Sequence, residues 1–408
     1  MPKTRLDGDV QPGFKWGPFT MRIPLVHLRF SLSNVLQGLA VAGATGMALV
    51  PYFIALLGLT FEEAITMAMF HSMLISFSWM FFGDPYAPGW LTPAIPFVVA
   101  FITAPAYLGD HTSQFQVMTA LSLNFAFILI FLGVTGLGAK LINIVPNVFK
   151  GGIILGAAIA AFLRVTKDGD AANVFQSAPI AGTLGVLICL VFAFSKPLQA
   201  YATDKTWLLK LLGFGLFPGF LVAGIVGYFT GEFEYNIRWE ILDVGASTAS
   251  LWAKASPFAI GWPPLEILAS SFPLALITYI LFFGDLVTGN EMIEQAQVTR
   301  TDEKLELNSS RAHMATGIRN VIMSIVAPFF ATQGVLWTGI QVVLLKGWSE
   351  GREKVDSIFD SIGSFYVFGL PVLFVILPFV TLLEPLLPLA LAVTCLLYTS
   401  DAADDSLR

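Results

Sequence analysis

Apolar runs of about 20 residues recur along this chain, and they constrain its fold more than any other feature. A helix of that length crosses the hydrocarbon core of a bilayer. Of the 408 residues, 56% are hydrophobic and 12% are charged, whereas a soluble domain has about 25% charged residues. The sequence therefore predicts an all-α polytopic membrane protein.

The expected spans alternate with short polar connections, and a longer hydrophilic segment at 232–264 divides the chain into halves, 31–231 and 265–394. Lysine and arginine positions place the N-terminus in the cytoplasm and the dividing segment outside. Residues 1–30 read as a basic, amphipathic lead-in, with Arg5 and Arg22 facing lipid phosphates. The spans lie at 32–57, 62–82, 91–107, 115–137, 142–163, 180–198, 207–230, 266–293, 312–328, 330–346, 364–381 and, as a fragment, 384–394.

The end of the chain has a composition unlike the rest. The stretch "CLLYTSDAADD" from Cys395 matches the translation of a sequencing adapter, so residues 395–408 are expected to be non-native and the second half incomplete. Cys395 and Cys189 are far apart in apolar sequence and predict neither a disulfide nor a metal site.

Two segments cannot be continuous helices. The first, "DPYAPGWLTPAIPFVV", contains four prolines, and the second, "APFFATQGVLWTGIQVV", contains a proline and two glycines. Broken backbone at membrane depth is tolerated where it lines a cavity or is buried in protein. One break in each half, at Pro93–Pro96 and at Thr332–Val335, predicts a binding site at mid-membrane between inverted repeats, with antiparallel half-strands that satisfy each other's backbone groups.

Candidate substrate-binding residues lie in these breaks, where helix N-termini with unpaired N–H groups would bind an anionic or hydrogen-bonding ligand. Loops outside the bilayer are the alternative. Gln37 in the first span is equally consistent with ligand binding or with capping a neighbouring helix. Asp84 is expected to cap or solvate the turn before the first break, and Tyr86 and Trp90 either stack on a planar substrate or lie at the membrane interface. The candidates in the breaks are Thr92, Ala94, Ile95, Thr332, Gln333, Gly334 and Val335.

An acidic residue, Asp285, stands within the apolar stretch "LFFGDLVTGNEMIEQ". Carboxylates in hydrocarbon are costly and usually face a cavity or a partner. Asp285 is therefore the candidate for the residue that takes up the coupling ion, with Thr288 and Asn290 as secondary candidates. The alternative is a solvated residue near the cytoplasmic mouth.

Three stretches resemble the uracil/xanthine permease (nucleobase–ascorbate transporter) family. "LQGLAVAGATGMALVPYFIALLGLTFEEA" is similar to its first helix, "LINIVPNVFKGGIILGAAI" to its fifth and "SRAHMATGIRNVIMSIVA" to its ninth. The resemblance implies a seven-plus-seven inverted-repeat fold with core and gate domains, shared with the sulfate permeases, and third and tenth segments that are half strand and half helix. The chain departs from the family at Gly38, where the family has histidine, and at Leu281, where it has glutamate, one helical turn before Asp285.

These features predict a secondary active transporter in a bacterial plasma membrane that couples a small polar or anionic solute to H+ or Na+ by alternating access. A nucleobase-like solute of the uracil or xanthine class is the first interpretation, and a sulfate-permease-like inorganic or carboxylate anion is the alternative. A passive channel or a membrane-embedded enzyme is less favoured, because no catalytic motif or phosphate loop occurs. No cofactor, metal or nucleic acid is expected; a homodimer is left open.

Overall fold

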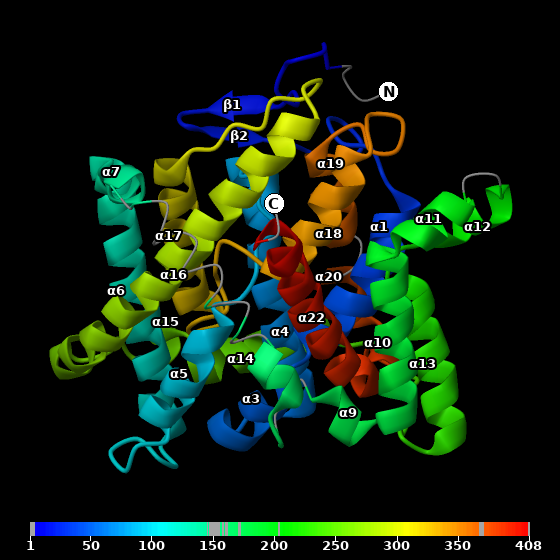
Figure 1. Ribbon diagram of the computed structural model, residues 1–408. Helices are drawn as coiled ribbons and strands as arrows, with labels where there is room; N and C mark the ends of the chain where they lie inside the picture. Colours follow the sequence, from blue (N-terminus) through cyan, green and yellow to red (C-terminus); the bar gives the residue numbers. More distant parts are fainter. Residues whose placement is uncertain are drawn as a thin grey trace. The chain divides into compact units, whose positions relative to one another are not determined.

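The computed structural model describes residues 5–144, 146, 156, 159, 162–169, 173–202, 205–366 and 371–406. Helices make up most of this part of the chain, together with one two-stranded sheet (Figure 1). Among the described residues, five helices are long and apolar enough to cross a membrane, or six if a bent pair counts as one span. The prediction of a mostly helical, polytopic chain is confirmed.

Two compact units form the structure, and each contains segments from both halves of the chain. This is the composition expected of the core and gate domains of an inverted-repeat transporter. The seven-plus-seven repeat itself stays a prediction. The first unit comprises Met1–Leu28, Leu49–Lys150 and Leu242–Trp337; the second comprises Arg29–Ala48, Gly151–Ile241 and Thr338–Arg408.

The first unit is built around α6, which packs against both α16 and α17. Polar side chains cap two of its long helices: Asp110 accepts from the Ser113 N–H at the start of α6, and Asn308 caps α17. A capping box of Thr60 and Glu63 begins α4. The helices are α3 (Val50–Leu57), α4 (Phe61–Phe77) with its continuation Ser78–Phe82, Thr92–Ala94, α5 (Ile95–Ile102), α6 (His111–Thr135), α7 (Leu137–Ile144), α14 (Val244–Ala255), α15 (Pro257–Ile260), α16 (Leu265–Thr299) and α17 (Ser309–Val326).

The second unit contains two helix pairs, α10 against α13 and α18 against α22. Several expected spans are interrupted here: 207–230 divides at Gly215, whose φ of 58° ends a helix, and 364–381 contains three short helices. The span expected at 142–163 lies largely outside the described residues. The helices are α1 (Leu32–Gln37), Gly38–Ala42, α2 (Gly43–Gly46), α9 (Val174–Ser177), α10 (Pro179–Phe194), α11 (Lys196–Ala202), α12 (Thr206–Gly213), α13 (Phe217–Thr230), α18 (Thr338–Ser349), α19 (Ile358–Tyr366), α20 (Pro371–Val375), α21 (Leu377–Leu383), Glu384–Leu386 and α22 (Leu387–Ser406), which runs into the segment predicted to be adapter-derived.

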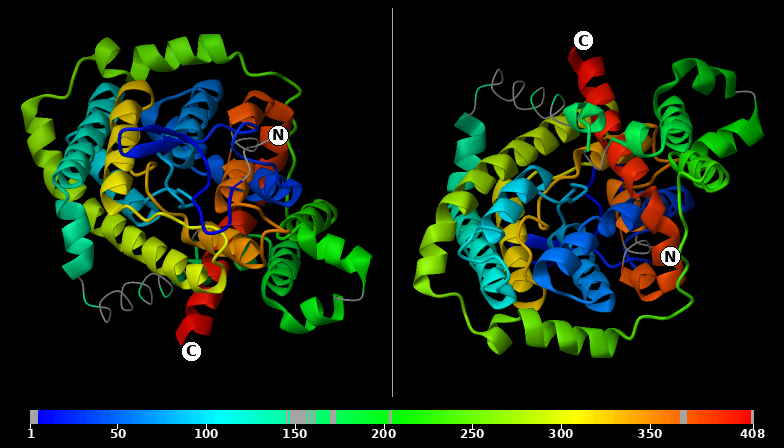
Figure 2. Two further views of the ribbon diagram at one scale, coloured as in Figure 1. Left: turned by 90° about the horizontal axis from the view of Figure 1, so that it is seen from above. Right: turned by 90° about the horizontal axis from the view of Figure 1, so that it is seen from below.

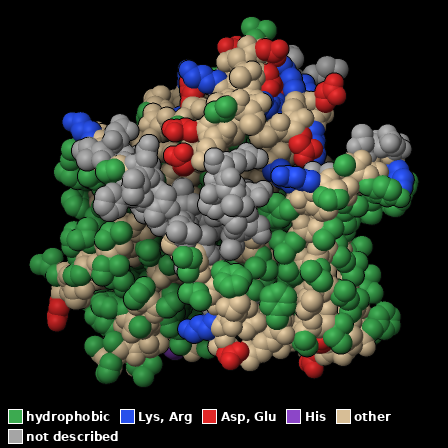
Figure 3. Space-filling model, viewed as in Figure 1, with side chains coloured by type: hydrophobic (Ala, Val, Ile, Leu, Met, Phe, Trp, Pro, Cys, Tyr) green, Lys and Arg blue, Asp and Glu red, His purple; other side chains and the backbone are tan. Residues whose placement is uncertain are grey.

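The N-terminal segment is packed into the first unit. A hairpin of β1 (Phe14–Trp16) and β2 (Phe19–Met21) lies at the top of Figure 1, beside the ends of α16 and α17, and Figure 2 shows it from above. In Figure 3 charged side chains gather at this end.

The expected contact of Arg5 and Arg22 with lipid phosphates is wrong, because both guanidinium groups are buried. Arg5 Nη2 lies 3.0 Å from Asp302 Oδ2, and Arg22 donates to the Gln11 carbonyl at 2.9 Å. Burial lowers the pKa of Arg22 to about 10. Arg22 Nη1 also donates to the Gly83 carbonyl at 3.5 Å, so both arginines attach the N-terminal segment to the rest of the first unit.

Candidate functional site

The two broken segments lie side by side in the first unit and pair through their backbones. Residue numbers increase along the first break while the numbers of their partners in the second break decrease, so the pairing is antiparallel. The predicted antiparallel pairing is confirmed, but in the first break it uses the stretch from Ala87 to Leu91 and not the expected Pro93–Pro96, which lies in helical turns; its depth in a membrane stays a prediction. The bonds run from Leu91 N to Ala331 O (2.8 Å), from Gly334 N to Gly89 O (2.7 Å) and from Trp337 N to Ala87 O (2.6 Å).

Glycine permits this close approach at two positions. A Cβ on Gly89 would lie 2.7 Å from the Trp337 Cβ, and one on Gly334 would lie 2.8 Å from the Gly89 oxygen. Real Cβ atoms essentially never show contacts under 3.0 Å. Helices follow both paired stretches: α5 begins at Ile95, and α18 begins at Thr338. Each break is therefore a non-helical, backbone-paired stretch followed by a helix; the structure assigns no β-strand to either stretch, so the predicted half-strands are present only as this irregular pairing.

The expectation of unpaired N–H groups is wrong for Gly334. Its N–H is donated to Gly89, and the helix that follows begins only at Thr338, beyond Val335. The residues from Thr332 to Val335 thus belong to the non-helical, paired part of the second break. Backbone pairing satisfies polar groups of this part before the helix starts.

The helical part of the first break holds the other expected candidates. Thr92 and Ala94 lie in a short 3-10 helix that contacts α16, and Ile95 begins α5. Ala94 is buried, whereas Thr92 and Ile95 are partly exposed. The Thr92 hydroxyl lies 3.5 Å from the Trp90 carbonyl, which leaves it only weakly engaged.

A fully buried polar network on α17 holds the second break in place. Arg319 donates to the Gly334 carbonyl at 2.8 Å and to Gln333 Oε1 at 3.2 Å. Asn320 Nδ2 donates to the Gln333 carbonyl at 3.2 Å, and Gln333 Nε2 donates to the His71 carbonyl at 3.1 Å. Arg319 and Asn320 were not among the predicted site residues, although an adjacent cation and amide in "GIRNVIMS" is itself a signal of a functional or structural site.

Asp285 stands on α16 without a partner. Within the described part of the chain, no hydrogen bond or ion pair engages its carboxylate, and the residue is partly exposed. One turn later α16 contacts the first break: the Tyr86 hydroxyl donates to Asn290 Oδ1 at 2.5 Å, and the Tyr86 ring packs on Gly289. Thr288 is buried at the same level. Asp285 therefore lies on the helix that supports the paired breaks.

Two expected roles at the first break are wrong. Tyr86 is fully buried, so its ring offers no stacking surface for a substrate. Asp84 does not cap a solvated turn: it is 1% exposed and its Oδ1 accepts a hydrogen bond from Arg311 Nε at 2.8 Å. A buried carboxylate needs such a partner, and Arg311 supplies the compensating charge from α17.

Gln37 belongs to the second unit. Its Nε2 donates to Ser33 and Asn34 of its own helix, and its Oε1 accepts from the Leu216 N–H at 3.4 Å, at the start of α13. This contact is the helix-capping alternative considered for the residue.

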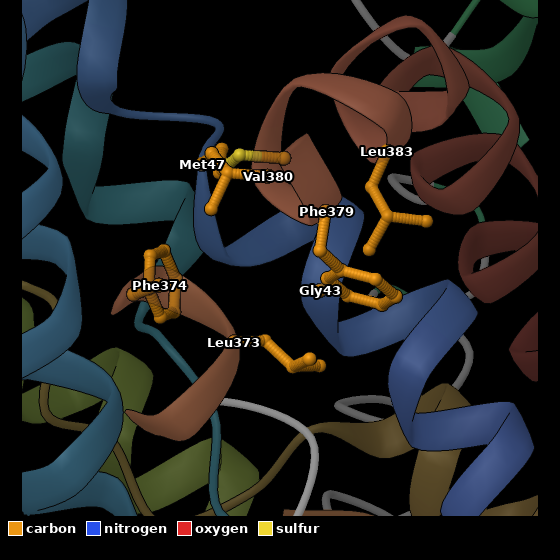
Figure 4. Close-up of a pocket in the computed structure, with 7 residues that line it drawn as sticks. All are labelled: Gly43, Met47, Leu373, Phe374, Phe379, Val380 and Leu383. Carbon is orange, nitrogen blue, oxygen red and sulfur yellow. The ribbon is translucent and has the colours of Figure 1, made fainter. Parts of the chain in front are cut away.

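The second unit also contains a small apolar pocket (Figure 4). It offers no charged or strongly polar side chain, so it does not suit a polar solute. Gly43, Met47, Leu373, Phe374, Phe379, Val380 and Leu383 line it. Among the described residues, no group of three or more His, Cys, Asp or Glu side chains could hold a metal ion.

Comparison with known proteins gives no family model and no curated protein that matches. Among solved structures, the chain is similar to "the transmembrane domain of a cyanobacterium bicarbonate transporter", BicA, at 13% sequence identity and a TM-score of 0.41, over 92% of this chain and 97% of that one. The class of the protein follows from its own structure. It is a helical, polytopic membrane protein whose first unit holds two paired, broken segments.

Proposed function

We propose that this protein is a secondary active transporter of a small polar or anionic solute, with the paired breaks of the first unit as its binding element. The antiparallel pairing of two broken segments from opposite halves of the chain carries the proposal. Broken segments of this kind mark the substrate sites of transporters built from inverted repeats. Each unit contains segments from both halves of the chain. This composition suits alternating access, in which one unit moves against the other.

Charge favours an anion as the solute. Arg319 places a fixed, buried cation on the carbonyl of Gly334, beside the paired stretch. The helix α5 begins at Ile95, so its partial positive end is close to the same break. A small inorganic or carboxylate anion is attracted by both groups.

A nucleobase-like solute is the second candidate. The sequence resemblance to uracil and xanthine permeases favours it, together with one buried amide. Asn320 is fully buried, and in the described structure its Oδ1 accepts no hydrogen bond. An amide oxygen of this kind pairs well with the N–H edge of a planar base.

Asp285 is the proposed coupling residue. A carboxylate without a partner in an apolar helix costs free energy, so its presence there is a reason to assign it a function. Taking up H+ or Na+ would neutralise it, and a difference in its occupancy between inward and outward states would couple the solute to the ion gradient.

Uptake by the purified protein in proteoliposomes tests the proposal. Labelled bicarbonate, sulfate, uracil and xanthine are offered with an imposed H+ or Na+ gradient. We expect gradient-driven accumulation of one class, which stops when the gradient is dissipated. If none of these solutes is accumulated or exchanged, the proposal fails.

Asp285→Asn separates coupling from binding. It keeps size and hydrogen bonding but cannot change charge, so we expect accumulation to be lost and exchange of solute present on both sides to remain. Glu294→Gln, which removes an exposed carboxylate further along the same helix, is the matched control and should accumulate normally. Normal accumulation by Asp285→Asn with an unchanged pH profile would show that Asp285 is only a solvated residue.

A further inference from the structure

An exposed aromatic cluster stands on the connection between α14 and α16. The Trp252 and Phe258 rings are stacked, 6.3 Å apart at an interplanar angle of 3°, and the Trp262 ring meets Phe258 edge-on at 5.3 Å. Their side chains are 38%, 65% and 48% exposed for Trp252, Phe258 and Trp262. Contiguous apolar surface of this kind marks an interaction site.

The cluster is held rigidly on the first unit. The α14 residues Ser247, Leu251 and Ala255 are buried on the face that packs against α4. On the same side, Lys254 Nζ lies 2.7 Å from Glu63 Oε2, and Ser250 donates to the same carboxylate. A second attachment comes from α6, where Gln116 Nε2 donates to the Gly261 carbonyl at 3.3 Å. The aromatic side chains are therefore presented by fixed backbone.

The apolar surface continues from the cluster along α16. Within the described α16, a row of large exposed apolar side chains runs from Leu265 to Ile280 and then stops until Val298. Figure 2 shows α14, α15 and the beginning of α16 along the rim of the first unit. Because α16 is a candidate membrane span, this row is where lipid chains would lie. Its members are Leu265, Phe272, Leu276, Ile277 and Ile280.

We infer that the Trp252–Phe258–Trp262 cluster is a membrane-interface anchor whose partner is the lipid headgroup layer. Two tryptophans near the beginning of a lipid-facing helix match the aromatic belts of membrane proteins, where the apolar ring meets lipid and the indole N–H meets water; the Phe258 ring adds apolar surface between them. Continuity with the apolar row of α16 favours lipid over a second copy of the chain. The inference rests on the membrane-spanning class and needs no assumption about the solute.

The anchor fixes one end of α16 in the membrane, and the depth of Asp285 follows from its distance along the helix. At 1.5 Å per residue, the helix from Leu265 to Asp285 is about 30 Å long, close to the thickness of a hydrocarbon core. Asp285 therefore lies in the half of the membrane remote from the anchor, on the side of the N-terminal hairpin. Tilt of α16 would move it toward the middle of the membrane without changing that side.

Spin-label accessibility in the full chain tests the anchor. A background of Cys189→Ala and Cys395→Ala carries single substitutions Phe258→Cys, Trp262→Cys, Leu276→Cys or Ile280→Cys, with Lys15→Cys on the hairpin as the aqueous reference. Labelled protein is placed in vesicles of phosphatidylcholine and phosphatidylglycerol. Relaxation by oxygen, which enters hydrocarbon, is compared with relaxation by a water-soluble nickel complex.

We expect the ratio of oxygen to nickel accessibility to be several-fold higher at position 276 than at position 15. Positions 258 and 262 should be intermediate, and position 280 should fall below position 276. A ratio at 262 equal to that at 15 would place the cluster in water and overturn the inference. Exclusion of both reagents at 262 would show a protein partner and overturn it too. If Phe258→Cys fails to fold, the accessibility ratio of Trp262→Cys alone tests the inference. Neither the oxygen nor the nickel accessibility depends on transport.

Discussion

Replacing Gly334 by alanine tests the paired breaks most directly. The Gly334 N–H donates to the Gly89 carbonyl at 2.7 Å, and an added Cβ would stand 2.8 Å from that same oxygen. It would also lie 3.1 Å from the Leu91 Cγ. Both neighbours belong to the first break, and the oxygen is backbone, so the two segments must separate and the hydrogen bond must lengthen.

The cost has two parts. Leaving a buried donor or acceptor without its partner costs about 1–3 kcal/mol. Overpacking by an added methyl group costs about 1–3 kcal/mol more. Gly334→Ala should therefore lower the free energy of unfolding by about 2–6 kcal/mol. Gly347→Ala, in α18, is the matched control: its Cβ meets nothing within 4 Å, and alanine is favoured over glycine inside a helix by about 1 kcal/mol.

Two measurements check this prediction. Unfolding by sodium dodecyl sulfate in mixed micelles gives the free-energy differences, and uptake in proteoliposomes gives the effect on transport. We expect Gly334→Ala to lose both stability and uptake, and Gly347→Ala to keep both. If Gly334→Ala has wild-type stability and uptake, the close pairing of the breaks is not what holds this site together.

Three further predictions concern charged side chains. Arg311→Ala leaves the Asp84 carboxylate buried without its ion-pair partner and should cost about 3–5 kcal/mol in the same unfolding titration; a loss below about 1 kcal/mol would contradict the pairing. Arg319→Lys keeps the charge but loses the planar fork that grips the second break, so KM for the solute should rise while the accumulation ratio persists, as measured by uptake against concentration. A hydrogen bond from Arg300 lowers the pKa of Asp302 below its ordinary value of 3.8, so the stabilising contribution of Asp302 is present above about pH 4 and is lost as the pH falls through the lowered pKa. Amide exchange, corrected for intrinsic rates, should show the N-terminal segment opening only in that acid range. Protection of this segment that persists there would contradict the prediction.

The breaks could be predicted from the sequence because their cause is local. Proline removes a backbone donor wherever it stands, so the prolines of the first break exclude a helix without any knowledge of tertiary structure. The antiparallel pairing also followed, since two unsatisfied backbones in one protein interior need each other. The start of the second helix at Thr338 did not follow, because Gly334 is compatible with either conformation and only its bond to Gly89 decides.

The buried charges could not be predicted, because their partners are distant in sequence. Arg311 lies 227 positions after Asp84, and Arg5 lies 297 positions before Asp302. Nothing beside these residues in the chain indicates that they meet, so a solvated position was the natural expectation for each. Each ion pair offsets part of the cost of taking its charges out of water, a gain that exists only once the chain has folded.

In the proposed transport cycle, Arg319 and Asp285 of the first unit have different roles. Asp285 lies within α16, a candidate membrane span, and Arg319 lies within α17, seven residues before its last residue, Val326. Arg319 is fixed, because its guanidinium is bonded to Gln333 and Gly334 and cannot leave without opening the second break. In the described structure Asp285 has no bond to break, so it can gain or lose an ion at no cost to packing. A constant positive field suits attraction of an anion, and a variable negative charge suits coupling, so substitutions at Arg319 should act on affinity and those at Asp285 on accumulation.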